Sequence, residues 1–266
     1  MIDPEQRPPT ASASCRACRE GEGSAIAISM AFQPLVDLRA RAIVGYEALV
    51  RGPSQESAAH VLAQVNDTNR YAFDQSCRVR AIELAAQLGL QGMLSINFLP
   101  NAVYRPETCI RATLQAARTH GFPTERLMFE VNESERVVDH AHLKAIFAEY
   151  HRQGFTTAID DFGAGHSGLN LLAEFQPDIV KLDMALTRHI DRDRVRRSIV
   201  QATMGMCADL GIRVIAEGIE TAEECLALQD LGVHLFQGYL FARPGFEHLP
   251  AVGPEAWGAV TRTTGV

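Results

Sequence analysis

The amino-acid sequence predicts an α/β fold, a modified TIM-like (β/α) barrel in which an N-terminal hairpin supplies one antiparallel strand. Short apolar strands alternate with helical patterns over most of the chain, and repeated βα units imply right-handed crossovers and a parallel sheet. No glycine-rich fingerprint follows the first strand, which disfavours the alternative of an open, doubly wound sheet. Polar residues recur where the strands end, which is where barrel active sites are built.

The expected elements begin with the hairpin. Two β-rich runs, Ser29–Val36 and Ala42–Val50, are joined by a charged turn, and a helical pattern then extends over Tyr71–Leu88. Later strands are expected at Leu94–Phe98, Leu127–Val131, Thr156–Ile159, Ile179–Leu182, Val214–Ala216 and Val233–Phe236. The helices between them are expected at Ile110–Thr119, His142–Arg152, Ser198–Leu210 and Ala222–Leu231.

The composition indicates one domain with two tails. Residues 1–24 are rich in proline, serine, glycine and charge, which predicts a flexible tail. Residues 25–250 contain no comparable break and are expected to form a single barrel domain, followed by a C-terminal tail at 251–266. Hydrophobic residues make up 47% of the 266 and charged residues 21%, values typical of a soluble globular protein rather than of a disordered chain or a coiled coil.

Charge and hydrophobicity restrict the partners and the location. The net charge of −7 is the reverse of the basic excess typical of nucleic-acid binders, so no DNA partner is expected. No window approaches the roughly 18 apolar residues of a membrane span, and the N-terminus lacks the apolar core of a signal peptide. Six cysteines are too few for a disulfide framework, so we expect a reducing, cytoplasmic location. Cys15 and Cys18 form a lone pair without the second pair of a zinc site.

The polar residues at the strand ends form the main chemical signal. In chain order they are Glu47, Asn97, Glu130, Asp160, Asp161, Lys181, Glu217 and Gln237. Carboxylates that face one barrel mouth would repel each other unless cations lay between them. Mg²⁺ and Mn²⁺ prefer oxygen ligands, and an Asp-Asp pair can supply a carboxylate that bridges two ions. Two such ions are suited to phosphodiester cleavage.

A simpler interpretation applies to each of these residues alone. An acidic residue after a strand is usually a helix cap or a solvated loop residue, and Asp161 before Phe-Gly could merely begin a turn. Lys181 is harder to explain in this way, because an ammonium group inside an apolar strand is costly without acidic partners. The recurrence of such residues at one edge of one barrel favours a functional site.

These residues resemble a known family. The segment Tyr46-Glu47-Ala48-Leu49-Val50-Arg51 carries the signature tripeptide of the EAL domains, which hydrolyse the bacterial second messenger cyclic di-GMP. The resemblance extends from about Phe32 to Pro244. Its other motifs follow in order at Phe32-Gln33-Pro34, Asn97, Glu130-Val131-Asn132-Glu133, Asp160-Asp161-Phe162-Gly163, residues 178–183, Ala216-Glu217-Gly218-Ile219-Glu220 and Gln237-Gly238-Tyr239.

The resemblance implies a role for each matching residue. The first metal ion would be held by Glu47, Asn97, Glu130 and Asp160, and the second by Asp160, Asp161 and Glu217. The catalytic set would comprise Lys181, which orients and polarises the attacking water, with Gln237, Glu217 and Glu47. Contacts to the substrate would come from Arg51 at a phosphate, Gln33 at a guanine and Asp183. Glu133 would anchor the loop that follows Asp161, which in the family lies near a dimer interface.

The implied function is hydrolysis of cyclic di-GMP to linear pGpG by a phosphodiesterase that uses two Mg²⁺ or Mn²⁺ ions. The alternatives are a non-catalytic cyclic di-GMP sensor or protein-interaction module, and a sugar-phosphate barrel enzyme, which would not explain the paired aspartates or Glu47. A homodimer and a regulatory protein partner are expected. The sequence departs from the family pattern at Gly52, Asn132 and His166, none of which is an implied metal ligand.

Overall fold

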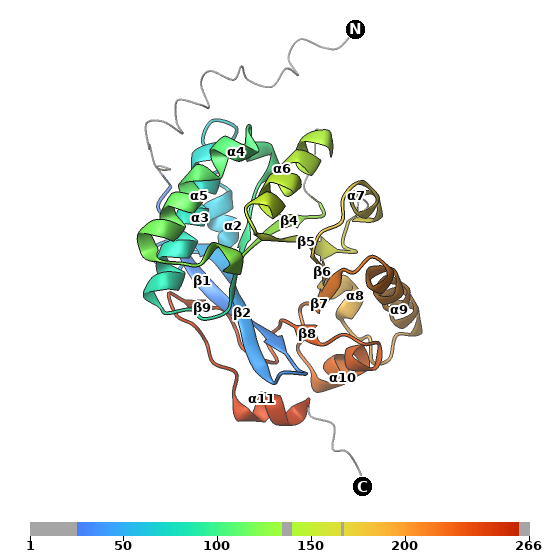
Figure 1. The fold of residues 1–266 in the computed structure, drawn as a ribbon. Helices are drawn as coiled ribbons and strands as arrows, with labels where there is room; N and C mark the ends of the chain where they lie inside the picture. The colour runs from blue at the N-terminus through green and yellow to red at the C-terminus, as the bar shows by residue number, and fades with distance from the viewer. Residues whose placement is uncertain (1–25, 135–139, 166–167, 261–266) are drawn as a thin grey trace.

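The computed structural model describes residues 26–134, 140–165 and 168–260 of the chain. Eight of the described strands close into a ring that is surrounded by helices (Figure 1). In chain order these strands are β1 (Ser29–Asp37), β2 (Ala42–Arg51), β3 (Met93–Asn97), β4 (Leu127–Asn132), β5 (Thr156–Phe162), β6 (Ile179–Leu182), β7 (Arg213–Ala216) and β8 (Leu235–Phe236). Strands β2 to β8 are parallel, and a short β9 (Gly245–Phe246) pairs with β1. The predicted modified barrel is confirmed.

The N-terminal hairpin explains why β1 runs against its neighbours. Asp37 Oδ1 accepts hydrogen bonds from the backbone N–H groups of Arg39 at 2.8 Å and Ala40 at 3.2 Å, so the chain reverses in a tight turn. Strand β1 is antiparallel both to β2 and to β8, and it thereby closes the ring. Gln33 lies opposite Glu47 in the hairpin register. Two polar residues of the predicted site are therefore neighbours across the hairpin.

The helices cover the outside of the ring (Figure 1). The longer ones are α3 (Arg70–Gln87), α5 (Arg111–His120), α6 (His140–Arg152), α9 (Arg194–Asp209) and α10 (Ala222–Asp230). Shorter segments are α2 (Ala58–Leu62), α4 (Pro106–Cys109), α7 (Gly168–Glu174), α8 (Met184–Thr187), α11 (Pro254–Ala259) and the 3₁₀ turns η2 (Pro100–Ala102) and η3 (Thr124–Arg126). Local sequence sets their starts: Thr221 and Glu224 form a capping box at α10, and Asp193 accepts hydrogen bonds from two N–H groups at the start of α9.

Two apolar layers result from the alternation of side chains along each strand. The larger layer fills the space between strands and helices, whereas a small group fills the barrel interior: Leu35, Met128, Ala158, Ile179, Ile215 and Leu235. Because successive side chains of a strand point to opposite faces, Glu130 shares the inner face with Met128, and Lys181 shares it with Ile179. Both polar residues therefore point into the barrel, one step nearer the carboxyl ends of the strands than the apolar group.

Several details differ from expectation or lie outside it. Within the range 251–266 that was expected to be a C-terminal tail, α11 packs on the barrel: Ala256 and Val260 are buried, and the ring centroids of Trp257 and Phe241 are 6.4 Å apart. Strand β8 is shorter than predicted. The predicted tail at 1–24, with its cysteine pair, lies outside the described residues. No described helix has the length and apolar character that a membrane crossing requires. The described cysteines are all free: Cys77, Cys109, Cys207 and Cys225.

Candidate active site

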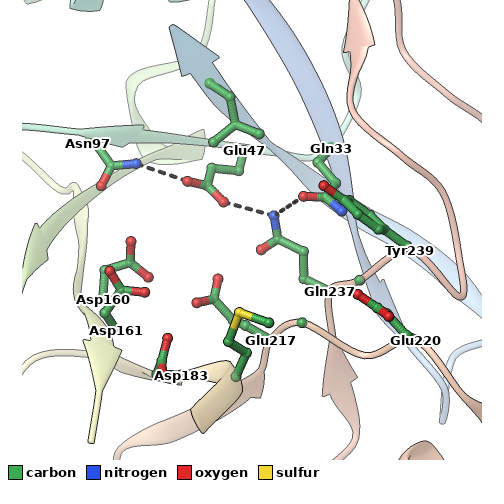
Figure 2. A pocket seen from close by; sticks show the side chains of 14 residues that line it. Gln33, Glu47, Asn97, Asp160, Asp161, Asp183, Glu217, Glu220, Gln237 and Tyr239 are labelled. Atoms are coloured by element: carbon green, nitrogen blue, oxygen red, sulfur yellow. Dashed lines mark hydrogen bonds between the residues drawn. The ribbon is translucent and has the colours of Figure 1, made fainter. Parts of the chain in front are cut away.

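A cavity of about 400 Å³ opens at the carboxyl ends of the strands (Figure 2). Most of the predicted site residues line it, and they come from β1, β2, β3, β5 and the segments after β6, β7 and β8: Gln33, Glu47, Asn97, Asp160, Asp161, Asp183, Glu217 and Gln237. Side chains that are far apart in the sequence thus converge on one space, because parallel strands of a barrel present their carboxyl ends on one rim.

Lys181 lies at the floor of this site and is completely buried. Its ammonium nitrogen contacts one carboxylate oxygen from each of four residues, at 2.7 Å for Glu217, 2.8 Å for Glu130, 3.0 Å for Asp160 and 3.3 Å for Glu47. Burial alone would lower the pKa of Lys181, but the four carboxylates outweigh it and hold this pKa well above its usual value. The lysine is therefore a fixed cation that partly compensates the acidic cluster.

The carboxylates fall into two groups that share Asp160. Oxygens of Glu47, Glu130 and Asp160 lie within 4.8 Å of one another, and so do oxygens of Asp160, Asp161 and Glu217. Asn97 lies beside the first group, where its Nδ2 donates a hydrogen bond to Glu47 Oε1 at 2.9 Å. Each group has the composition of one of the two ligand sets that the sequence resemblance implies, with the same aspartate between them.

The donor set fits hard divalent cations. Glu130 Oε1 is buried and has no hydrogen-bond partner, which is costly for a carboxylate oxygen unless a cation completes the site. Burial raises the pKa of Glu130 to about 8, although Lys181 opposes the shift, and burial together with the Asp160 charge raises the pKa of Asp161 to about 6. Both carboxyl groups are therefore costly to ionise where they lie, because they are buried beside other carboxylates, and a nearby cation would offset this cost. Oxygen-rich, carboxylate-dominated sites of this kind suit Mg²⁺ or Mn²⁺.

A backbone irregularity allows two consecutive aspartates to face the cavity. Neighbouring strand residues normally point to opposite faces. In β5 the pairing with β6 shifts register between Ile159 and Phe162, and Asp161 has a φ of 54°, in the left-handed region. Asp161 therefore turns toward the same side as Asp160 (Figure 2). Asn132 Nδ2 donates a hydrogen bond to Asp161 Oδ2 and so fixes this carboxylate.

A hydrogen-bonded row of side chains continues from Glu47 along the cavity wall (Figure 2). Gln237 Nε2 donates to Glu47 Oε2 at 2.8 Å and to Gln33 Oε1 at 3.1 Å. Gln33 Nε2 in turn donates to the backbone carbonyl of Ala242 at 3.1 Å. The Oε1 atom of Gln237 is buried and has no protein partner. This amide oxygen is thus available to accept a hydrogen bond from a bound molecule.

Glu133 contacts the loop that follows Asp161. Its Oε2 accepts hydrogen bonds from the backbone N–H groups of Gly163 at 2.6 Å and Gly165 at 3.4 Å, and its Oε1 accepts one from Gly168 at 2.7 Å. The carboxylate is almost fully buried. Glycine is required at 168, because a Cβ there would lie 2.7 Å from the Phe162 ring and 3.0 Å from Glu133 Cδ.

Two predicted substrate residues lie in different surroundings. Asp183 lines the cavity and also caps α8, since its Oδ1 accepts a hydrogen bond from Ala185 N at 2.7 Å. Arg51 ends β2 and is not among the cavity-lining residues; its guanidinium donates to the carbonyl of Val50 at 2.7 Å. The structure therefore does not bring Arg51 to the carboxylates.

Sequence reasoning assigned no role to some residues that border the site. Glu220 and Tyr239 line the cavity, and Asn132 contacts a predicted metal ligand. Each lies within three residues of a predicted site residue, so its position in a motif could have indicated that it borders the site. His166, the third departure from the family pattern, lies outside the described residues.

Comparison with known proteins agrees with this geometry. A family model for the EAL domain matches residues 21–244. The antirepressor BluF of Escherichia coli K12 is 32% identical over 228 residues, which cover 85% of this chain and 56% of BluF. The cyclic di-GMP phosphodiesterase PA2567 of Pseudomonas aeruginosa is 29% identical over 233 residues, which cover 81% of this chain and 38% of that protein. The chain thus spans about half or less of the length of these curated relatives.

Solved structures give the same assignment. A standalone EAL protein from Vibrio cholerae O395, in its c-di-GMP-bound form, is 56% identical with a TM-score of 0.85, and the match covers 87% of this chain and 98% of that one. A manganese and cyclic di-GMP complex of Klebsiella pneumoniae BlrP1 is 35% identical with a TM-score of 0.80, covering 85% and 58% of the two chains. With its barrel, its ordered motifs and these matches, the chain belongs to the EAL domain family.

Proposed function

We propose that this protein is a metal-dependent phosphodiesterase that hydrolyses cyclic di-GMP to linear pGpG. The observation that carries the proposal is the pair of carboxylate groups that share Asp160 around the buried Lys181 ammonium, at the floor of an open cavity. The names of several relatives support the substrate, because they are cyclic di-GMP phosphodiesterases. All of the side chains that the family resemblance implies for metal binding are present.

Two cations would be held by the two carboxylate groups. Glu47, Asn97, Glu130 and Asp160 would hold one, and Asp160, Asp161 and Glu217 the other. When bound, Mg²⁺ or Mn²⁺ ions lower the pKa of water and neutralise charge on a phosphodiester. The buried, unpartnered Glu130 Oε1 supports this occupancy, since a cation would satisfy it.

The protein side chains would orient the reactants. Lys181 contacts four carboxylates, three of them on β2, β4 and β5 and the fourth just after β7. Because an ammonium group has three N–H groups, one of them could orient the attacking water once bound cations had taken over part of these contacts. Gln237 would hold the same water through its unpartnered Oε1, while its Nε2 stays bound to Glu47. Gln33 and Asp183, on the cavity wall, would contact the nucleotide. Arg51 would reach a phosphate only after its side chain leaves the Val50 carbonyl.

A second candidate function is that of a cyclic di-GMP-responsive interaction module without catalysis. It is favoured by the relative BluF, which is named an antirepressor and not a hydrolase. The two candidates share the ligand and differ in whether the bound nucleotide is cleaved. We also propose a homodimer, a regulatory protein partner and a cytoplasmic location, which sedimentation, affinity capture and cell fractionation would test.

Incubation with cyclic di-GMP and Mg²⁺ or Mn²⁺, followed by chromatography, separates the two candidates. The expected product is pGpG, and Glu47→Gln should remove the activity. Glu174→Gln, at an exposed position at the end of α7, is the matched control and should keep wild-type turnover. If the substrate stays unchanged with either metal while the protein binds the nucleotide tightly, the phosphodiesterase proposal is refuted and the interaction module is favoured.

A further inference from the structure

A buried polar cluster lies outside the barrel, behind strands β3 and β4. It consists of Asp74 and Arg78 from α3 and Tyr150 from α6, and is called the α3–α6 cluster below. Arg78 and Tyr150 are fully buried and Asp74 is 3% exposed. The cluster lies on the helix-facing side of the strands, opposite to the carboxylates of the cavity. None of its residues belongs to the motifs of the proposed catalytic site.

Polar contacts hold the cluster together and connect it to the end of β3. An Arg78 guanidinium nitrogen lies 2.7 Å from Asp74 Oδ2, and another donates a hydrogen bond to the Tyr150 hydroxyl at 2.7 Å. The remaining carboxylate oxygen, Asp74 Oδ1, accepts a hydrogen bond from the backbone N–H of Leu99 at 2.9 Å. Leu99 lies two residues after Asn97, so this bond fixes the path of the chain just beyond a proposed metal ligand.

Aromatic rings connect the cluster to β3 and β4. The Arg78 guanidinium carbon lies 5.5 Å from the centre of the Phe98 ring and 5.2 Å from that of Phe129. Phe98 directly follows Asn97, and Phe129 directly precedes Glu130. Because neighbouring side chains point to opposite faces, a ring held on the helix side sets the direction of the ligand beside it on the cavity side. The Phe98 N–H also donates to the Glu130 carbonyl at 3.0 Å.

Stability alone does not account for a charged cluster at this place. A buried ion pair loses about as much free energy by desolvation as it gains by attraction, and apolar side chains of similar volume are often as stable. Apolar residues would fill the space but could not accept the Leu99 N–H or fix the planes of the two rings through a guanidinium. The cluster therefore differs from an apolar core in that its contacts fix the direction of the Leu99 N–H and the orientation of the two rings.

We propose that Asp74, Arg78 and Tyr150 are positioning residues for the first cation site, which hold Asn97 and Glu130 in the geometry that binds the ion. This inference rests on the proposed function, because it takes the carboxylate groups to be cation sites. Partners of metal ligands typically change metal affinity 10- to 100-fold when they are removed. The α3–α6 cluster acts one step further away, through backbone and rings, so the lower end of this range is expected.

The inference can be tested without turnover by measuring how tightly the metal-stripped protein binds Mn²⁺. The electron paramagnetic resonance signal of free Mn²⁺ reports this binding. Asp74→Asn keeps the shape and removes the charge that faces Arg78, and it should weaken one of the two binding constants about 10-fold. Tyr150→Phe removes only the hydroxyl, should change the same constant in the same direction, and carries the test if Asp74→Asn does not fold. Val200→Ala, a buried truncation in α9, is the control for stability.

Thermal melting separates positioning from a purely structural role. If Asp74→Asn or Tyr150→Phe weakens Mn²⁺ binding while Val200→Ala lowers the melting temperature without doing so, the inference holds. Variants that melt earlier but bind Mn²⁺ as the wild type does would overturn it and leave the proposed function intact. A wild-type chain that takes up no Mn²⁺ would overturn the proposed metal-dependent function, and the inference with it.

Discussion

The Glu133 carboxylate is the anchor of the loop between β5 and α7, and its removal is the sharpest test of how that loop serves the site. It accepts two short hydrogen bonds, from Gly163 at 2.6 Å and Gly168 at 2.7 Å, and a longer one from Gly165 at 3.4 Å. Gly163 lies two residues after Asp161, which lines the cavity and belongs to the second carboxylate group. The backbone that Glu133 anchors is therefore continuous with a proposed metal ligand.

The magnitude follows from these bonds. A hydrogen bond to a charged group contributes about 1.5–3 kcal/mol. Glu133→Ala removes both short bonds, so the loop should lose at least about 3 kcal/mol of local ordering. Each 1.4 kcal/mol changes an equilibrium about tenfold, so the ordered loop should become about 100-fold less favoured. A displacement of about 1 Å at Asp161 can itself lower the rate by about 10²-fold.

Cyclic di-GMP hydrolysis measured against Mg²⁺ concentration is the appropriate assay, with thermal melting of the same samples. Glu133→Ala should require more Mg²⁺ and turn over about 10²-fold more slowly, while the barrel still melts cooperatively. Glu133→Gln keeps one acceptor oxygen and should lie between Glu133→Ala and the wild type. Glu174→Ala, at an exposed position on α7, should behave as the wild type. Wild-type turnover and Mg²⁺ dependence in a folded Glu133→Ala would refute the reasoning.

Four further predictions concern the metal, the catalytic lysine, the arginine and the acid stability. Chelation of the metal ions should abolish hydrolysis, and Mg²⁺ or Mn²⁺ should restore it. Ca²⁺ should bind yet support little reaction, because its bonds to oxygen are longer and its coordination geometry is more flexible. Full activity in excess chelator would contradict the ligand assignment. Lys181→Met should slow hydrolysis by at least ~10²-fold while calorimetry still detects nucleotide binding, and an equal loss of affinity would contradict its catalytic role. Arg51→Ala should weaken cyclic di-GMP binding by roughly 1.5–3 kcal/mol in calorimetry, and unchanged affinity would place Arg51 outside the binding site. Burial would raise the pKa of Asp178, but hydrogen bonds from Thr157 and His151 lower it on balance. Asp178→Asn should therefore lower the free energy of unfolding at neutral pH, and this difference between variant and wild type should shrink as the pH falls through the folded-state pKa of Asp178. Denaturant titrations at several pH values measure the difference, and a pH-independent value would contradict the assignment.

Much of the fold was predictable because the order of short apolar runs and helical segments along the chain indicates it. The runs at Ile179–Leu182 and Leu127–Asn132 are apolar and short, and they alternate with helical segments, so a parallel sheet covered by helices followed from the order alone. The helix α11 (Pro254–Ala259) was not predicted, because its short sequence has no strong periodicity. What holds α11 in place is burial against the distant Phe241, a contact that no local pattern reports.

The sequence by itself also determined which polar residues share one rim, since most of them lie at or near the carboxyl end of a parallel strand and the fold brings these ends to the same side. Only the tertiary structure decided how they meet: Lys181 contacts Glu47 across 134 positions, and Asp161 turns into the cavity because β5 shifts its register there. It also decided that Arg51 points to its own strand and that Arg78 is buried behind two proposed ligands. These contacts depend on how the ring closes and staggers, which is a property of all strands together and of no single segment.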